Sequence, residues 1–273
     1  MAERTSTPRA LVDILWPGRR HAYGRRLSQI GELRLPEGRG PHPVCVLLHG
    51  GYWRARWSRR GTRPIAADLA RRGWATWNLE YRRVGRGQGG GWPATLQDVA
   101  AGIDHLADLR APLDLDRVAA VGHSAGGQLA VWAAARAALP EDAPGAAPMV
   151  RIRAVAALAA VLNMELPAIT GPGEPVNRFL GGTPEEVPDR YAQANPMRRL
   201  PVGVPMLLVH GLDDETIPVK RSRQFAEAAR AAGDEVELLE LPDVDHRQVV
   251  DPRTPAWNPT AGWLERLGWL GSP

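Results

Sequence analysis

The residues that could do chemistry are organised around one serine. Ser124 lies in the G-x-S-x-G pattern of residues 122–126, between the apolar run 118–121 and the alanine-rich stretch 128–138. In a tight turn from a strand to a helix, such a serine is exposed, and glycines flank it because a Cβ would clash with the crossing backbone. The backbone N–H of Ala125, at the start of the helix, would face a negative charge beside the serine. The stretch predicts a nucleophilic serine, although the pentapeptide alone also fits a plain glycine-containing loop.

A second glycine motif supplies hydrogen-bond donors. His49-Gly50-Gly51-Tyr52-Trp53 directly follows the apolar run 43–48. Two adjacent glycines let the backbone turn sharply and approach a ligand, so the amides of Gly51 and Tyr52 could join that of Ala125 around an oxyanion. By itself His-Gly-Gly could be an ordinary turn, but two such turns at strand ends favour an oxyanion hole.

The remaining candidates are an acid and a histidine in later loops. Asp213 and Asp214 follow the apolar run 204–209, and His246 follows the run 235–240. The chain order serine, acid, histidine is the one that a strand–turn–helix fold with such a serine requires. His246 would take the proton of Ser124, and the acid would orient the imidazole. The spacing leaves open which of the two aspartates is the acid.

The elements that must position these groups alternate along the chain. Continuous apolar runs predict strands that are buried on both faces, as in a parallel sheet, and a mostly parallel, doubly wound α/β sheet is expected. Strands are predicted at 30–35, 43–48, 74–79, 117–121, 152–161, 204–209 and 235–240, and helices at 94–109, 127–138, 219–232 and 259–270.

Two segments stand outside this alternation. Residues 163–199, rich in glycine and proline, are predicted to form a small cap of short helices over the carboxyl edge of the sheet. Residues 1–24 are interpreted as a basic arm, with a helical turn near Leu11 to Leu15, stopped by Trp16-Pro17-Gly18. The domain itself is expected to span residues 25–273.

Composition limits the partners and the compartment. The net charge is +4, and residues 1–86 carry 18 arginines against six acidic residues. The arginines are scattered and match no nucleic-acid-binding module, so no nucleic-acid partner is expected. The single Cys45 excludes an internal disulfide, and no apolar run suggests a signal sequence or a membrane span. A cytoplasmic protein without a membrane partner is predicted.

Together these motifs resemble the α/β-hydrolase superfamily, and more closely its HGG-bearing esterases, which include the hormone-sensitive-lipase-like esterases and the kynurenine formamidases. The residues that carry the resemblance are His49-Gly50-Gly51-Tyr52-Trp53, Glu80-Tyr81-Arg82, Trp92-Pro93-Ala94 with Asp98, residues 122–127, Gly211 to Pro218, and His246 with Val249-Val250-Asp251. The resemblance implies Asp214 as the triad acid, a serine hydrolase of small acyl esters or N-formyl and aryl amides, and no metal or cofactor. A homodimer is a further possibility, and a binding protein without turnover is the alternative function.

Substrate contacts are predicted from aromatic residues near the motifs. Trp53, Trp57 and Trp92 lie in loops expected to rim the strand ends, where flat rings could hold an aryl group, although ordinary packing would also explain them. Arginines after the second motif could attract a carboxylate, unless they form an exposed face; they are Arg54, Arg56, Arg59 and Arg60. A small cap leaves limited room, so short acyl chains are expected to be preferred.

Overall fold

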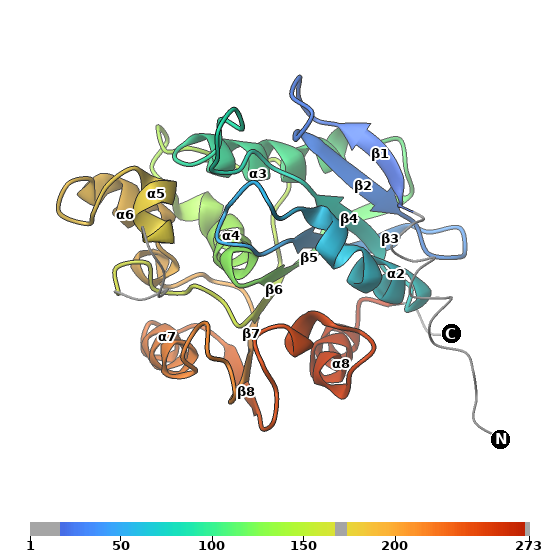
Figure 1. Ribbon diagram of the computed structural model, residues 1–273. Helices are drawn as coiled ribbons and strands as arrows, with labels where there is room; N and C mark the ends of the chain where they lie inside the picture. The colour runs from blue at the N-terminus through green and yellow to red at the C-terminus, as the bar shows by residue number, and fades with distance from the viewer. Residues whose placement is uncertain (1–16, 167–173, 271–273) are drawn as a thin grey trace.

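One twisted sheet of eight strands organises the computed structural model, which describes residues 17–166 and 174–270 (Figure 1). The strand order is β1-β2-β4-β3-β5-β6-β7-β8, with β1 and β2 antiparallel and the others parallel. The strands are β1 (Arg19–Ala22), β2 (Ile30–Arg34), β3 (His42–Leu48), β4 (Ala75–Leu79), β5 (Leu113–His123), β6 (Ala154–Leu158), β7 (Met206–Gly211) and β8 (Val236–Leu241). The predicted α/β-hydrolase fold is confirmed.

Helices cover both faces of the sheet. They are α2 (Arg63–Arg71), α3 (Ala94–Asp104), α4 (Ala125–Ala134), α5 (Pro175–Leu180), α6 (Pro188–Ala194), α7 (Lys220–Ala231) and α8 (Asn258–Arg266). Short 3₁₀ turns are η1 (Arg59–Thr62), η2 (His105–Asp108), η3 (Ala135–Ala138), η4 (Pro196–Arg199), η5 (Gln248–Val250) and η6 (Pro255–Trp257). Apolar residues of α3, α4 and α7 share one core cluster, whereas those of α2 and α8 share the other. In the described ranges, no helix has the length and apolar character needed to cross a membrane.

Most predicted elements occur within a few residues of their expected bounds, and α2 is the helix that the pattern did not predict. It lies between β3 and β4 in the chain and buries Ile65, Ala66 and Leu69 against the sheet. Arginine at two of its positions, Arg63 and Arg71, hides the apolar face in the sequence. A long arginine side chain can lie along the edge of the core while its charged end stays in a polar environment. A partly buried helix can therefore contain arginines, and its run of apolar residues is then too narrow to be recognised in the sequence.

The predicted boundary of the basic arm was wrong. Residues 19–22 form β1, which pairs with β2 from Arg19 opposite Leu33 to Ala22 opposite Ile30. The Tyr23 hydroxyl then donates to the Glu80 carbonyl at 2.6 Å. An edge strand needs one partner and buries little, so a charged sequence without apolar alternation can form it. The helical turn predicted near residues 11–15 lies outside the described residues.

The predicted cap contains α5, α6 and η4, and its described part packs beside α4 (Figure 1). The Gln128 side chain donates to the Ala194 carbonyl at 2.9 Å, and the Trp132 indole donates to the Gln193 carbonyl at 3.1 Å. None of the described cap residues lines the pocket that holds Ser124. The described part of this insertion therefore packs against the side of α4. The prediction that it covers the pocket as a lid was wrong for these residues.

Removal of residues 1–24 is expected to lower the melting temperature by several degrees, because it deletes β1 and the Tyr23 hydrogen bond and leaves β2 as an unprotected edge. Removal of residues 1–16 keeps β1 and serves as the control. Thermal unfolding followed by circular dichroism compares the two with the full chain. Equal melting of the full chain and the 25–273 variant would contradict a structural role for β1.

Candidate active site

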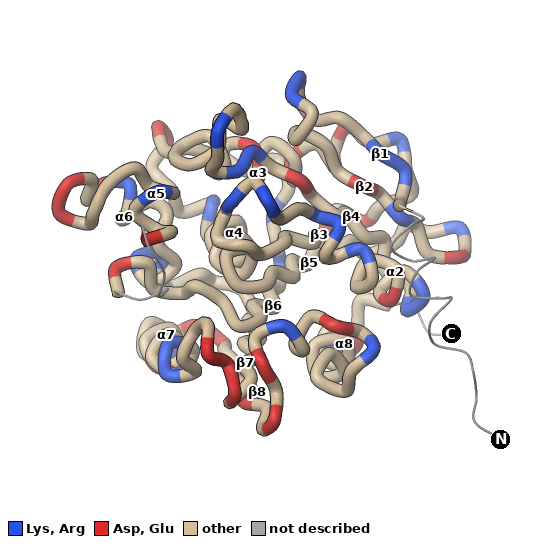
Figure 2. Tube along the Cα trace, viewed as in Figure 1, with Lys and Arg blue, Asp and Glu red and all other residues tan. Residues whose placement is uncertain are grey.

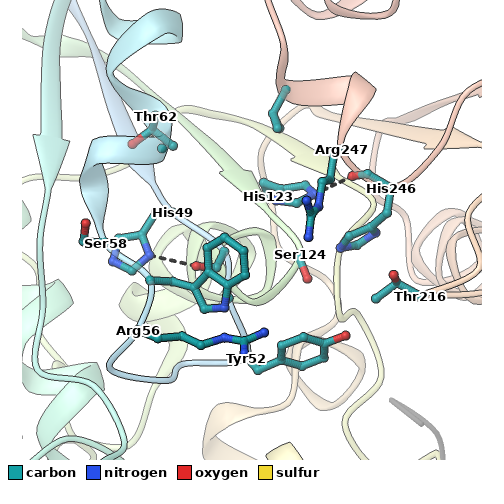
Figure 3. Close-up of a pocket in the computed structure, with 15 residues that line it drawn as sticks. His49, Tyr52, Arg56, Ser58, Thr62, His123, Ser124, Thr216, His246 and Arg247 are labelled. Carbon is teal, nitrogen blue, oxygen red and sulfur yellow. Dashed lines mark hydrogen bonds between the residues drawn. The ribbon is translucent and has the colours of Figure 1, made fainter. Parts of the chain in front are cut away.

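The loops after four parallel strands meet at one edge of the sheet. Ser124 follows β5, Asp214 follows β7, His246 follows β8, and the His49 to Trp53 loop follows β3. Carboxyl ends of parallel strands share an edge, so these loops converge. They surround a pocket of about 350 Å³, lined by residues that include His49, Gly51, Tyr52, Ser124 and His246 (Figure 3).

Ser124 is held at the sharp turn between β5 and α4. Its φ is 53° and its ψ is −118°, a conformation that side chains rarely adopt. A Cβ on Gly122 would lie 2.1 Å from the Gly126 carbonyl oxygen, and one on Gly126 would lie 2.1 Å from the Leu48 carbonyl oxygen. The two glycines are therefore required because the turn passes so close to other backbone. The Ser124 amide donates to the Leu158 carbonyl at 2.9 Å, which ties the turn to β6.

The structure brings Asp214, and not Asp213, against the histidine. His246 Nδ1 lies 2.7 Å from Asp214 Oδ2, whereas Asp213 is exposed. The other Asp214 oxygen accepts the amides of Thr216 and Ile217, each at 2.8 Å. A carboxylate accepts only, so Nδ1 of His246 carries the proton and Nε2 is left for the pocket side. Ser124 and His246 both project into the pocket (Figure 3).

A second histidine supports the same carboxylate. His210 Nε2 lies 3.1 Å from Asp214 Oδ2 and 2.8 Å from the Ile217 carbonyl, and its Nδ1 lies 2.7 Å from the Ser222 hydroxyl. Burial raises the pKa of Asp214, but the hydrogen bonds from His210, His246 and the Ile217 amide outweigh it and hold that pKa far below its usual value. Asp214 is therefore ionised at any pH at which the protein would work.

His123, the residue directly before Ser124, anchors the loop that carries His246. Its Nε2 lies 2.7 Å from the His246 carbonyl, so Nε2 donates. Burial, followed by repulsion from His246, lowers the pKa of His123 to about 3. A neutral His123 thus fixes the backbone of His246 without adding charge beside it.

Two of the three predicted oxyanion donors line the pocket, and the third lies next to Ser124 in the chain. Gly51 and Tyr52 line it, and Ala125 is the first residue of α4 beside Ser124. Gly51 and Tyr52 have φ of 115° and 55°, which turns the loop sharply there. Within the described residues, the amides of Gly51, Tyr52 and Ala125 donate to no protein acceptor. Amides without an acceptor are what an oxyanion hole requires, so the three remain the candidate donors.

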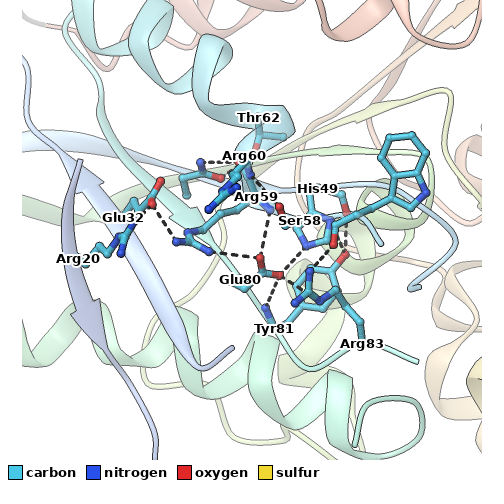
Figure 4. Close-up of polar contacts among 12 residues, drawn as sticks. Arg20, Glu32, His49, Ser58, Arg59, Arg60, Thr62, Glu80, Tyr81 and Arg83 are labelled. Carbon is cyan, nitrogen blue, oxygen red and sulfur yellow. Dashed lines mark hydrogen bonds and ion pairs between the residues drawn. The ribbon is translucent and has the colours of Figure 1, made fainter. Parts of the chain in front are cut away.

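A buried ionic network supports this loop from behind (Figure 4). His49 Nε2 lies 2.9 Å from Glu80 Oε1, and the His49 ring stacks on Tyr81 with centroids 4.4 Å apart. Arg59 bridges Glu80 at 3.3 Å and Glu32 at 2.9 Å. Burial raises the pKa of Glu80, but the charge and hydrogen bond of His49, with Arg83 nearby, outweigh it and keep that pKa below its ordinary value.

Glu80→Gln is expected to destabilise the fold by about 3 kcal/mol at neutral pH, because Arg59 and His49 lose a buried counter-charge. The pKa of Glu80 is lowered on folding, so its stabilising effect is complete above the unfolded carboxyl pKa of about 4.3 and is lost as the pH falls toward the folded value. Urea unfolding at several pH values measures this. The exposed Glu37→Gln is the control, and a wild type–variant difference that grows in acid would contradict the assignment.

Of the three tryptophans predicted to contact substrate, the structure brings Trp57 alone to the pocket. Trp53 is fully buried, stacks on Phe179 with centroids 4.5 Å apart, and donates from its indole to Gln128 at 3.1 Å. Trp92 packs on the core, and its amide donates to the Phe179 carbonyl at 2.7 Å. The predictions for Trp53 and Trp92 were wrong because α5 covers the side of the loops that they face.

The pocket also contains residues that the motifs did not single out. Thr216, Ser58 and Arg247 line it, and Arg56 does so as one of the arginines considered for a carboxylate. Arg59 is instead buried in the network with Glu32 and Glu80. The position of Arg247 directly after His246 was a signal available in the sequence.

Comparisons with known proteins identify the family of the chain and several relatives. The family model BD-FAE matches residues 32–229. The chain is similar to the esterase LipC of Mycobacterium tuberculosis, with 29% identity over 229 residues that cover 76% of this chain and 53% of that protein. It is also similar to the probable carboxylic ester hydrolase LipM of the same organism, with 27% identity over 225 residues, 76% of this chain and 49% of that protein. The chain thus spans about half the length of these relatives.

Solved structures share the fold at low identity. A truncated carbohydrate esterase from gut microbiota superposes with a TM-score of 0.78 and 19% identity, covering 92% of this chain and 95% of that one. The butyrate-bound esterase Est2 of Thermogutta terrifontis superposes with a TM-score of 0.74 and 22% identity, covering 95% and 97%. With the family model matching residues 32–229 and an α/β-hydrolase sheet carrying the loops of Ser124, Asp214 and His246, the chain belongs to the BD-FAE family of α/β-hydrolase-like esterases.

Proposed function

We propose that this chain is a serine carboxylesterase that cleaves small acyl esters through an acyl-enzyme. The observation that carries the proposal is the 2.7 Å contact between Asp214 and His246 Nδ1 in a pocket shared with Ser124. That contact leaves Nε2 of His246 to take the proton of Ser124. The curated relatives named above are esterases, which favours esters over amides as the substrates.

The reaction follows from these groups in two halves. Ser124 Oγ attacks the ester carbonyl carbon as its proton passes to His246, and the amides of Gly51, Tyr52 and Ala125 stabilise the oxyanion. His246 then returns the proton to the leaving alcohol, which departs and leaves an acyl group on Ser124. His246 then takes a proton from a water molecule, whose oxygen attacks the acyl carbon. As the bond to Ser124 Oγ breaks, His246 returns that proton to Oγ, and the free acid leaves. Asp214 stays ionised and stabilises the imidazolium in both halves.

The size of the pocket supports a short acyl chain. A cavity of about 350 Å³ is at the small end of the range for ligand sites. We therefore expect kcat/KM to be highest for formyl to butyryl esters and to fall for octanoyl and longer ones. Aryl leaving groups are expected to react faster than alkyl ones, with Trp57 as the aromatic wall.

A panel of p-nitrophenyl esters from acetyl to dodecanoyl, beside an N-formyl aryl amide, tests this proposal. A steady rise in kcat/KM toward dodecanoyl would overturn the short-acyl assignment. Turnover of the N-formyl aryl amide would place the activity with the formamidases instead of the carboxylesterases. Tight binding of esters with no turnover of any of them would favour the alternative, a binding protein on the same fold.

Two further proposals from the sequence concern the whole protein. We propose a cytoplasmic location, and cell fractionation with an antibody against the chain would test it. We also retain a homodimer as a proposal, which light scattering during size-exclusion chromatography would test. A monomeric mass at micromolar concentration would overturn the second of these.

A further inference from the structure

Two arginines reach the pocket from different loops. Arg56 belongs to the loop that carries the Gly51 and Tyr52 amides, and Arg247 directly follows His246. Both line the pocket that contains Ser124, and Figure 3 shows their side chains reaching into it. Positive charge is therefore present on both the oxyanion side and the histidine side of the site.

Trp57 holds both guanidinium groups in place. The Arg56 Cζ lies 5.2 Å from the centroid of the Trp57 ring, and the Arg247 Cζ lies 5.7 Å from it. An Arg83 guanidinium N–H donates to the Trp57 carbonyl, and Arg83 in turn lies 3.5 Å from the buried Glu80. Cation–π contacts with a ring on an anchored backbone restrict the arginines before any ligand arrives.

Neither guanidinium has a carboxylate partner among the residues that the structure describes. Nearby Arg59 and Arg82 are, by contrast, paired with Glu80 and Asp98. The closest acid in sequence to Arg247 is Asp245, whose Oδ1 accepts the backbone amides of Arg247 and Gln248 at 2.7 Å and 2.9 Å. Arg56 and Arg247 thus keep their guanidinium donors for a ligand.

The rest of the pocket has no negative side chain. Its lining within the described chain comprises glycines, histidines, small polar residues, Tyr52, Trp57, Val250 and the two arginines, with no aspartate or glutamate. Asp214 is buried behind His246. Figure 2 shows that acidic residues instead gather around β8 and beside α7, whereas basic residues occur on the loops beside α3 and α4. Arg56 and Arg247 are exposed at the pocket, and a pocket lined by charge of one sign attracts a ligand of the opposite sign.

We propose that Arg56, Arg247 and Trp57 form an anion subsite, so that the preferred esters carry a carboxylate on the acyl or the alcohol portion. A planar carboxylate matches the guanidinium fork, which an uncharged ester of the same shape does not. This inference rests on the proposed esterase activity and specifies its substrate class. The carboxylate is bound and takes no part in bond making or breaking at Ser124.

Matched pairs of esters test the subsite on each side of the scissile bond. On the alcohol side, para-acetoxybenzoate is compared with para-acetoxybenzamide. On the acyl side, the p-nitrophenyl monoester of adipic acid is compared with its methyl ester. The measured quantity is the ratio of kcat/KM for the anionic ester to that for the neutral one, which a general loss of activity leaves unchanged.

Arg56→Gln and Arg247→Gln are each expected to lower this ratio about fivefold, both on the same side of the scissile bond, and the double variant is expected to lower it more than tenfold on that side. Arg247→Glu should lower it further by repelling the carboxylate. The control is Arg60→Gln, an exposed arginine of the same segment that does not line the pocket, and it should leave the ratio unchanged. Added salt should reduce the wild-type ratio, because it screens exposed charges.

A ratio that stays the same in the double variant on both sides would overturn the anion subsite, while turnover of the neutral esters would leave the esterase proposal standing. Absence of turnover for all four esters would instead count against the esterase proposal itself. A ratio that falls equally in Arg60→Gln would assign the effect to the general basic charge of this face and would also overturn the subsite. The side on which the ratio changes identifies which portion of the ester carries the charge.

Discussion

Ser124→Ala is expected to reduce kcat for a short p-nitrophenyl ester by about 10⁶-fold, with little effect on stability. The reason is geometric, because Ser124 stands at a φ of 53° between β5 and α4 and lines the same pocket as His246. Alanine keeps the Cβ and therefore the same backbone strain, so the loss reports the hydroxyl alone. The measurement is initial-rate kinetics of purified wild type and variant at matched melting temperature.

Covalent labelling gives an independent test of the same residue. A fluorophosphonate probe should modify Ser124 in the wild type and nothing in the Ala variant, as read by peptide mass spectrometry. Ser58 is the informative comparison, because it is a second serine that lines the pocket but lies on the side of His49, away from His246 (Figure 3). An adduct on Ser58, or a Ser124→Ala variant that keeps a tenth of the activity, would overturn the assignment of the nucleophile.

Asp214→Asn is expected to lower kcat by about 10⁴-fold while KM changes little. Asp214 Oδ2 now receives hydrogen bonds from His246 Nδ1 at 2.7 Å and His210 Nε2 at 3.1 Å. An amide NH₂ at this position would favour the His246 tautomer with its proton on Nε2. That nitrogen could then no longer accept the proton of Ser124, so the chemical step fails although the substrate still binds.

The neighbouring aspartate provides the matched control for this substitution. Asp213 is exposed, and its amide donates to the Val244 carbonyl, so Asp213→Asn should keep activity within about twofold. Rates of fluorophosphonate labelling should follow kcat, because the same proton transfer activates Ser124. A large loss in Asp213→Asn with a small one in Asp214→Asn would move the acid by one residue in the chain.

Much of the framework could be read from local patterns. The continuous apolar runs that became β3, β6, β7 and the second half of β5 are buried, and such runs have few alternatives to a central parallel strand. Glycines at 122 and 126 are needed because backbone passes 2.1 Å from where their Cβ atoms would lie. Because only glycine fits at these two positions, the turn at Ser124 could be recognised from the sequence alone.

Other features had no local signal. The strand β1 has the sequence Arg-Arg-His-Ala, which contains no strand pattern. It forms because it pairs with the edge of β2, whose residues lie eight or more positions away in the chain. Glu80, Arg59 and His49 come from three segments, and only the folded chain joins them into one buried network (Figure 4). Ionic partners of this kind are chosen by proximity in space, which residue types alone do not specify.

The sequence by itself therefore determined the fold, the chain order of serine, acid and histidine, and the edge of the sheet where they meet. Only the tertiary structure decided which loop side chains enter the pocket. Trp53 turns away because Phe179, more than a hundred residues later, stacks on its ring, whereas Trp57 remains at the pocket between Arg56 and Arg247. Backbone turns follow from short-range sterics, but the direction of a loop side chain depends on whichever distant element packs against it.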